Sequence, residues 1–161
     1  MQRATKVLPP GSWDARDSAG TVLLTFDDRY RRRTRLTDTK GNAFLLDLEK
    51  PRVLQHGEGL LLDGGGVLAV IAADEPVADI HTHSLAETAR IAWHIGNRHI
   101  PLQVLADGRL RIRDDHVLVE MIEGLGAHVH RIMAPFSPEG GAYSEEARHA
   151  HDHHHGHDHE H

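Results

Sequence analysis

The sequence predicts an α+β protein with two domains, and three observations lead to this prediction. Residues 1–73 contain short apolar runs separated by glycine and turn residues, and none of them has the length or period of a long helix. Residues 77–133 follow the order strand–helix–strand–strand–helix–strand, which is typical of a ferredoxin-like domain. From residue 137 onward apolar residues almost vanish. We therefore expect a β-rich N-terminal domain over residues 1–75, a ferredoxin-like βαββαβ domain over 76–136 and a disordered, His-rich tail over 137–161.

The strands of the first domain are expected between turn signals. Residues 39–42 (TKGN) supply turn chemistry, and Pro51 and the glycines beyond it punctuate the later runs. Residues 74–76 (DEP) then interrupt the apolar pattern, and we expect them to be a hinge between the domains. The expected strands are residues 21–26, 31–38, 43–48, 60–62 and 67–73.

The second domain is expected to begin with a strand at residues 77–81 and a helix that Ser84 caps. Ser84 and Glu87 have the spacing of a capping box, in which each side chain accepts a hydrogen bond from the other residue's backbone N–H group. Gly96 and Asn97 can close this helix. Its apolar stripe is expected to comprise Leu85, Ala89, Ala92 and Ile95.

Two short strands should follow at residues 102–105 and 110–113, joined by a turn at residues 107–108. Asp114 or Asp115 can cap a second helix that Gly126 ends, and a last strand is expected at residues 129–133. The apolar stripe of the second helix is expected to comprise Val117 or Leu118, Met121 or Ile122, and Leu125.

The composition excludes several classes of protein. The chain has 16 His and no Cys, so it forms no disulfide framework, thiolate zinc site or iron–sulfur cluster and has no Cys nucleophile. Its N-terminus lacks the apolar core of a signal peptide, and its longest apolar run, residues 67–73, is far shorter than the roughly 20 residues of a membrane span. A net charge of −6 argues against general nucleic-acid binding. We therefore expect a cytoplasmic protein that binds neither membranes nor nucleic acid.

The C-terminal tail is the first candidate metal site. Imidazoles are mostly neutral at neutral pH and can ligate nickel, copper(II) or zinc, although the Irving–Williams order gives such a tail little selectivity. The alternative is an added affinity tag, but a tag is an unbroken His run, whereas the longest run here is residues 153–155. The expected ligands of the tail are His149, His151, His153, His154, His155, His157, His159 and His161.

The second candidate site is the segment HIGNRHIPLQ, residues 94–103. It places His94 at the end of the first helix and His99 in the loop beyond it, with Asn97 and Arg98 available to orient the imidazoles. The alternative is a solvated helix end, where His is common because it complements the helix dipole. Spacing alone favours this alternative.

Four sequence elements change the balance: HIGNRHIPLQ, DDHVLVEM, PFSPEGGAY and the His-rich tail occur in this order, after RLTDTKGNAFLLDLEKPRVLQHGEGLLL in the first half. With these elements the whole chain resembles the UreE family of urease accessory proteins. The resemblance implies a homodimeric nickel metallochaperone, with a peptide-binding-like N-terminal β domain and a ferredoxin-like metal-binding domain. It also implies that His99 pairs with its copy across the two-fold axis to bind one nickel ion, and that His94 has a structural or orienting role.

A further family feature carries over only in part. Some members have a peripheral site with the sequence H-D-H, whereas this chain has Asp114, Asp115 and His116 there, so only His116 matches as a ligand. His116 lies in the first turn of a helix, where the positive end of the dipole disfavours imidazolium and keeps the ring able to bind metal. The alternative is a simple surface residue. A single His99 is a poor site, but an isologous interface doubles it, and the tails can complete the coordination.

Two H-x-H pairs, His81/His83 and His128/His130, form an accessory candidate. Such a pair also opens the metal site of amidohydrolase barrels, but those need roughly 200 residues or more in one domain. The first and last strands of a ferredoxin-like sheet are antiparallel neighbours, so the four imidazoles are expected at one corner if the register places them on one face. The alternative is that these His residues are polar surface residues of two strands and bind no metal.

Residues 29–35 carry five Arg, which are either a solvated strand face or a docking surface for an acidic partner such as the urease apoprotein or the GTPase of its accessory complex. No nucleophile–base set and no phosphate loop can be assembled, so we do not expect an enzyme. The sequence thus predicts a protein that delivers nickel for urease assembly, with zinc or copper binding in vitro. The alternative is a nickel store without a delivery role, and a small metal-dependent hydrolase comes third.

Overall fold

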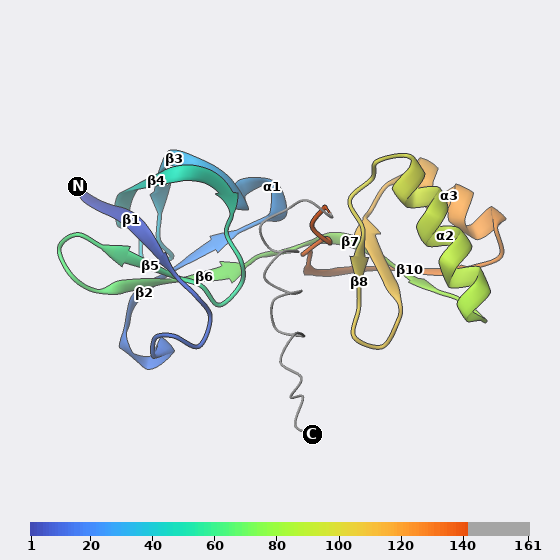
Figure 1. The fold of residues 1–161 in the computed structure, drawn as a ribbon, viewed down its shortest axis with the longest axis horizontal. Coiled ribbons are helices and arrows are strands. Elements are labelled where there is room, and N and C mark those ends of the chain that lie inside the picture. Colours follow the sequence, from blue (N-terminus) through green and yellow to red (C-terminus); the bar gives the residue numbers. More distant parts are fainter. Residues whose placement is uncertain (142–161) are drawn as a thin grey trace, which may run out of the picture.

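The computed structural model describes residues 1–141, which form two β-sheet domains side by side (Figure 1). The predicted tail ligands at residues 149–161 lie outside the described residues. In the described range no helix combines the length and hydrophobicity that crossing a membrane requires. The architecture is therefore the mixed α+β arrangement that the sequence predicts.

The N-terminal domain is a six-stranded sheet in the order β2-β6-β5-β1-β4-β3. Its apolar interior includes Phe44, Leu46, Leu54 and Leu60. Beside the strands the domain contains a 3₁₀ turn, η1 (Ala15–Asp17), and one helical turn, α1 (Phe26–Arg29). The strands are β1 (Gln2–Leu8), β2 (Ser18–Leu24), β3 (Tyr30–Thr37), β4 (Ala43–Val53), β5 (Gly59–Leu62) and β6 (Val67–Ala72).

Three features of this sheet differ from the sequence expectation. Strand β1 was not predicted, because Ala4 is its only fully buried side chain and gives a weak hydrophobic signal. Phe26 begins α1 rather than ending a strand. Strand β4 continues past Pro51, because its register with β3 shifts between Arg31 and Arg33, and Pro51 lies in the irregular stretch without an opposing residue.

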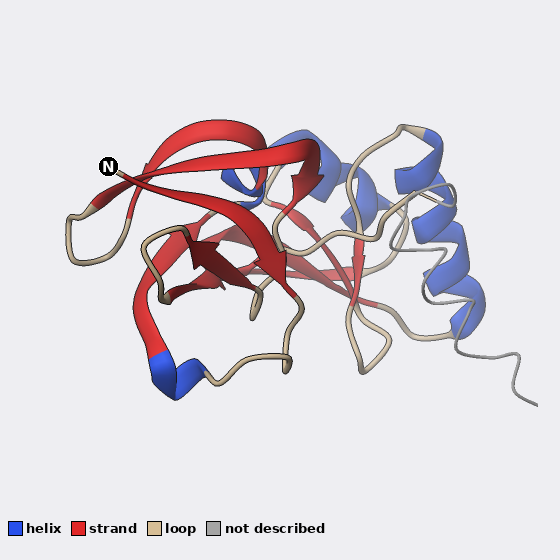
Figure 2. Ribbon diagram, turned by 60° about the vertical axis from the view of Figure 1, so that its left-hand side comes forward, coloured by secondary structure: helices blue, strands red, loops and turns tan. Residues whose placement is uncertain are grey.

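The C-terminal domain is a four-stranded sheet in the order β10-β7-β9-β8, with both helices on one side (Figure 2). Ala78, Ile80, Leu110 and Ile112 of the strands pack against apolar residues of the two helices. The elements follow in the order strand, helix, strand, strand, helix, strand. They are β7 (Asp74–His81), α2 (Leu85–Asn97), β8 (Gln103–Val104), β9 (Leu110–Arg113), α3 (His116–Gly124) and β10 (His128–Pro135).

The start of α2 is confirmed, but its predicted stripe is wrong at two positions. Ser84 Oγ accepts a hydrogen bond from the backbone N–H of Glu87 at 3.1 Å, as the capping box predicts. Leu85 is 89% exposed and Ala89 is exposed, whereas Ile91 and Ile95 are buried. A stripe that contains Ile91 and Ile95 has the same helical spacing as the predicted one. Burying these two isoleucines removes more apolar surface from water than burying Ala89 and Ile95.

The second helix, α3, is likewise capped as expected. Of the residues predicted for its apolar stripe, Ile122 is buried, whereas Val117 and Leu125 are exposed. Asp115 accepts a hydrogen bond from the backbone N–H of Leu118 at 3.0 Å. Val119 and Ile122 are buried, whereas Val117 is 71% and Leu125 43% exposed. The chain turns after Leu125 at Gly126, whose φ is +99°, so Leu125 does not reach the sheet.

The expected hinge at residues 74–76 is wrong, because these residues belong to β7 and pair with residues 133–135 of β10. Glu75 is buried and accepts a hydrogen bond from the backbone N–H of Phe26 at 2.9 Å. Across the same boundary Arg113 pairs with Asp27 at 2.8 Å and lies over the ring of Phe26. These contacts tie the two domains together.

Arg29 is fully buried at this boundary, so it is not part of the predicted basic surface. Its guanidinium donates hydrogen bonds to the carbonyl of Phe136 and, at 3.3 Å, to Ser137 Oγ. Burial lowers the pKa of Arg29, and the charge of Glu75 opposes that shift. The exposed remainder of the segment lies on β3, where Arg31 pairs with Asp28.

The segment after β10 is also held in place at its beginning. The backbone N–H of Ser137 donates to Gln103 Oε1 at 2.9 Å, and that of Glu139 donates to the carbonyl of Leu102 at 2.8 Å. The side chain of Glu139 accepts a hydrogen bond from the backbone N–H of Val104 at 3.0 Å. The prediction of a disordered tail starting at residue 137 is therefore wrong for residues 137–139.

Candidate metal centre

His99 occupies the position that ends α2 and has a left-handed backbone conformation. Its φ is +57°, the one positive value among the non-glycine residues that the structure describes. The backbone N–H of His99 donates to the carbonyl of Gly96 at 3.0 Å, and that of Ile100 donates to Ile95 at 3.3 Å. This pair of bonds is a Schellman motif, whose left-handed residue is usually glycine. Holding a β-carbon there costs about 1 kcal/mol, so a side chain at this position calls for an explanation in function.

The imidazole of His99 is exposed and borders a hollow of about 410 Å³. Two carboxylates line the same hollow, but both have partners: Asp115 caps α3, and Asp114 pairs with Arg131 at 3.1 Å. Between residues 1 and 141, no three His, Asp or Glu side chains are grouped in a way that holds a metal ion. His99 therefore presents an accessible imidazole, and no set of further ligands is grouped around it in the described range.

The neighbouring residues of the motif stabilise the helix end. His94 is half-buried, and its ring lies edge-to-face with that of Trp93 at 5.0 Å between centroids. Arg98 donates a hydrogen bond from Nη1 to the carbonyl of His94 at 2.9 Å. Asn97 is exposed at the last position of α2. Arg98 thus satisfies a carbonyl of the last turn, and its predicted role of orienting an imidazole stays a prediction.

His116 lies apart from this hollow. It is the first residue of α3, and its Nε2 is 3.3 Å from Glu120 Oε1, one helical turn further on. Its side chain is 76% exposed. The hollow beside His99 is lined by other residues, so one chain does not bring His99 and His116 into a common site.

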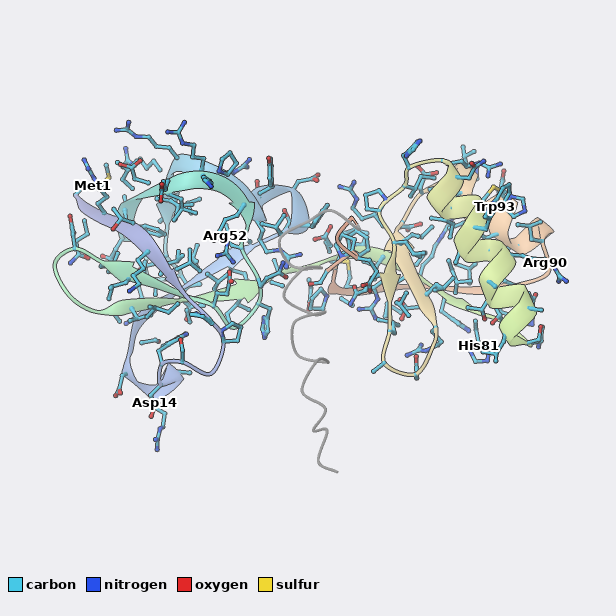
Figure 3. The ribbon with its side chains drawn as sticks, in the orientation of Figure 1. Met1, Asp14, Arg52, His81, Arg90 and Trp93 are labelled. Carbon is cyan, nitrogen blue, oxygen red and sulfur yellow. The ribbon has the colours of Figure 1, made fainter. Side chains whose placement is uncertain are left out.

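Trp93 is a feature that the sequence analysis missed. It is 62% exposed on the outer side of α2, in the last two turns before His99 (Figure 3). Tryptophan is uncommon at this exposure on monomers and is enriched at the centres of protein–protein interfaces. The signal that would have found it is the stripe of Ile91 and Ile95, which leaves Trp93 on the opposite side of the helix.

The two H-x-H pairs converge in part. Strands β7 and β10 are antiparallel neighbours, and His128 pairs directly with His81. The rings of His83 and His128 are in edge-to-face contact at 5.0 Å between centroids. His130 instead pairs with Asp79. Three of the four predicted imidazoles, those of His81, His83 and His128, therefore come from positions at the C-terminal end of β7.

Comparison with known proteins gives matches over nearly all of the chain. The sequence model described as UreE urease accessory protein, N-terminal domain, matches residues 4–73, and the one described as its C-terminal domain matches residues 75–161. The chain is 52% identical over 152 residues to the urease accessory protein UreE of Rhodopseudomonas palustris strain BisB18, covering 94% of this chain and 71% of that protein. It is 43% identical over 152 residues to the urease accessory protein UreE of Rhodobacter capsulatus, covering 94% and 93% of the two chains.

Proposed function

The chain belongs to the UreE family of urease accessory proteins, and on this premise we propose that it is a cytoplasmic, homodimeric metallochaperone that delivers Ni(II) to the urease apoprotein. Its role is non-catalytic, and nickel is its cargo. In this proposal residues 1–75 are a peptide-binding-like domain and residues 76–136 a ferredoxin-like domain that holds the metal.

The observation that carries the proposal is His99, an exposed imidazole in a left-handed position where glycine costs less. Neutral imidazole is a ligand of intermediate softness and suits Ni(II), with zinc and copper as competitors in vitro. One imidazole binds weakly, but a two-fold axis beside the end of α2 supplies the same residue twice. Solvent-accessible ligands also exchange readily, which a carrier needs and a structural metal site does not.

Trp93 supports the dimer. Its exposed ring lies on α2, whose C-cap, Arg98, directly precedes His99, and we propose that an interface burying Trp93 brings the two His99 side chains close to each other. The His residues of the tail and His116 are proposed as further ligands that complete the coordination sphere. Exposed Arg32 and Arg35 on β3 are proposed to dock acidic surfaces of the urease apoprotein or of the GTPase in its accessory complex.

Nickel transfer tests the proposal. The purified protein is loaded with Ni(II), mixed with apo-urease and its accessory proteins in the presence of a chelator that captures free nickel, and urease activity is followed. We expect activation by the wild type and at least a tenfold lower rate with His99→Gly, in keeping with the loss of a metal ligand. Normal delivery by His99→Gly contradicts the assignment. Nickel binding by the wild type without any activation identifies the protein as a nickel store instead.

A further inference from the structure

We propose that His81, His83 and His128 form a second site for a divalent transition-metal ion, at the end of α2 opposite to His99. Helix α2 has 13 residues, so the two sites are separated by about 20 Å along its axis. The proposal does not depend on the role of His99 or on the delivery of nickel.

The backbone directs these three side chains to one place. His81 and His128 are paired residues of neighbouring antiparallel strands, so their side chains lie on the same face with β-carbons about 4.5–5.5 Å apart. Thr82 turns the other way, since its hydroxyl hydrogen bonds that of Thr88 on α2. His81 lies on the strand face opposite to Ile80, which packs under the helices, and His83 follows in the bend before α2.

The position of His83 is fixed by the start of α2. Its backbone N–H donates to Glu87 Oε2 at 2.7 Å, so the side chain of Glu87 holds the residue that precedes the N-cap Ser84. The ring of His83 lies 5.0 Å from that of His128, centroid to centroid. Two imidazoles bound to one ion, with metal–nitrogen bonds of about 2.0–2.1 Å and ligand angles of about 90–110°, have centroids about 4.5–5.2 Å apart. The observed separation therefore matches that of two rings sharing an ion.

The surface beside two of the three imidazoles is hollowed, and His128 lies outside the lining of this hollow. His81 and His83 line a hollow of about 240 Å³ together with Asp107 and Arg109. The charge of Arg109 is balanced, since its Nε donates to Asp107 at 2.7 Å and its Nη1 lies 3.6 Å from Asp79. The guanidinium is thus held by carboxylates and repels a bound cation less than a free one does.

All three imidazoles are exposed, and exposed side chains change rotamer within nanoseconds. No three ligands in the described part of the chain already have metal-binding geometry. The ion therefore assembles the site by rotating the rings of His83 and His128, which are in contact, and that of His81, which is paired with His128 in the sheet. Bound there, it links the edge strand β10 to β7 and to the loop that leads into α2. The ligand class is a borderline cation such as Ni(II), Zn(II) or Cu(II), because the donors are imidazoles without thiolates.

The test uses the full chain and Ni(II) alone. Equilibrium dialysis counts the ions bound at saturation, and paramagnetic broadening of backbone amide signals in NMR spectra reports where they bind. We expect the double variant His83→Ala/His128→Ala to bind about one ion fewer per chain than the wild type. Ni(II) should broaden the amides of residues 81–83 and 128 in the wild type and in His99→Gly, but not in the double variant.

His130→Ala is the matched control, because His130 is exposed on the same strand and pairs with Asp79 rather than with an imidazole. It should keep the full count and the broadening at residues 81–83. The proposal is overturned if the double variant binds as many ions as the wild type. It is equally overturned if the amides of residues 81–83 remain sharp in the wild type, or if His130→Ala loses the same ion.

Discussion

Asp79 and Arg111 form a two-bond ion pair on the face of the C-terminal sheet that the helices leave uncovered. Arg111 donates from Nε at 2.6 Å and from Nη2 at 2.9 Å to the two carboxylate oxygens, and Asp79 is only 2% exposed. The hydrogen bond to Asp79 raises the pKa of Arg111. The same guanidinium donates to the carbonyl of Pro135 at 3.0 Å, so the pair joins β9 to β7 and to the end of β10.

Removing one partner of this pair should be costly. Asp79→Ala leaves the half-buried charge of Arg111 without its counter-ion, and we expect the free energy of unfolding to fall by about 3 kcal/mol. Urea denaturation measures this change. Asp107→Ala is the control, since Asp107 is exposed and its partner Arg109 is half-exposed and keeps its contact with Asp79, so the urea midpoint should hardly change. Equal losses of unfolding free energy in the two variants would contradict the claim that burial makes the Asp79–Arg111 pair the more costly one to break.

Two substitutions at His99 should separate the backbone from the side chain. In the metal-free protein, His99→Gly is expected to be more stable than His99→Ala by about 1 kcal/mol, because glycine adopts the left-handed conformation without steric cost. Both variants should lose nickel transfer. Thermal and urea unfolding give the stabilities. If alanine were the more stable substitution, the left-handed geometry of residue 99 in solution would be in question.

Trp93→Asp should shift the protein from dimer to monomer, because it places a charge where the proposed interface needs an apolar ring. Analytical ultracentrifugation at several concentrations gives the association state. Leu23→Ser is the control, since Leu23 is 55% exposed but belongs to the N-terminal domain. A Trp93→Asp protein that still dimerises would place the interface elsewhere.

Deletion of residues 146–161 should reduce nickel capacity without affecting the fold. The deleted segment contains no apolar side chain larger than alanine, so it adds nothing to a core. We expect the melting temperature of the metal-free protein to stay nearly unchanged and the number of bound ions to drop. Calorimetry and equilibrium dialysis provide the two measurements, and a large fall in melting temperature would be the contrary result.

Asp38 should contribute stability that depends on pH. Hydrogen bonds from the side chain and backbone of Asn42, at 3.0 and 2.8 Å, hold the pKa of Asp38 below its ordinary value of 3.8. A pKa lowered by folding gives stability that is complete above the unfolded pKa and is lost as the pH falls through the folded one. Asp38→Asn should therefore be destabilising at neutral pH, and the difference in urea midpoint should shrink below about pH 4. A difference that stays constant down to about pH 2 would exclude this linkage.

Local signals predicted the parts of the structure that depend on few residues. Ser84 and Asp115 cap the two helices as expected, and the antiparallel pairing of β7 with β10 places His128 opposite His81. The helix stripes were harder, because Leu85 and Ile91 fit the same period and only the tertiary contacts decide between them.

Long-range partners explain the other differences. The burial of Arg29 depends on Phe136, more than a hundred residues away, and a basic run gives no sign of such a contact. The prediction of a hinge at residues 74–76 was wrong for the same reason, since Glu75 accepts a hydrogen bond from Phe26 of the N-terminal domain. The motif predicts His99 as a ligand, and this stays a prediction. Its left-handed backbone follows from the Schellman bonds and cannot be read from the spacing of His residues.

The central place of β1 has a consequence for how the chain folds. Gln2 pairs in parallel with Phe44 of β4, and Ala4 pairs with Leu62 of β5 on the other side. The first strand to be synthesised therefore finds both of its neighbours among strands that are synthesised much later. Closing such loops costs entropy before any contact repays it, and proteins dominated by distant pairings fold slowly. During translation the N-terminal segment leaves the ribosome long before β4 and β5 exist. All six strands of the sheet are available only after β6, which ends at Ala72, has emerged, and until then the exposed apolar strands need a holding chaperone to stay unaggregated.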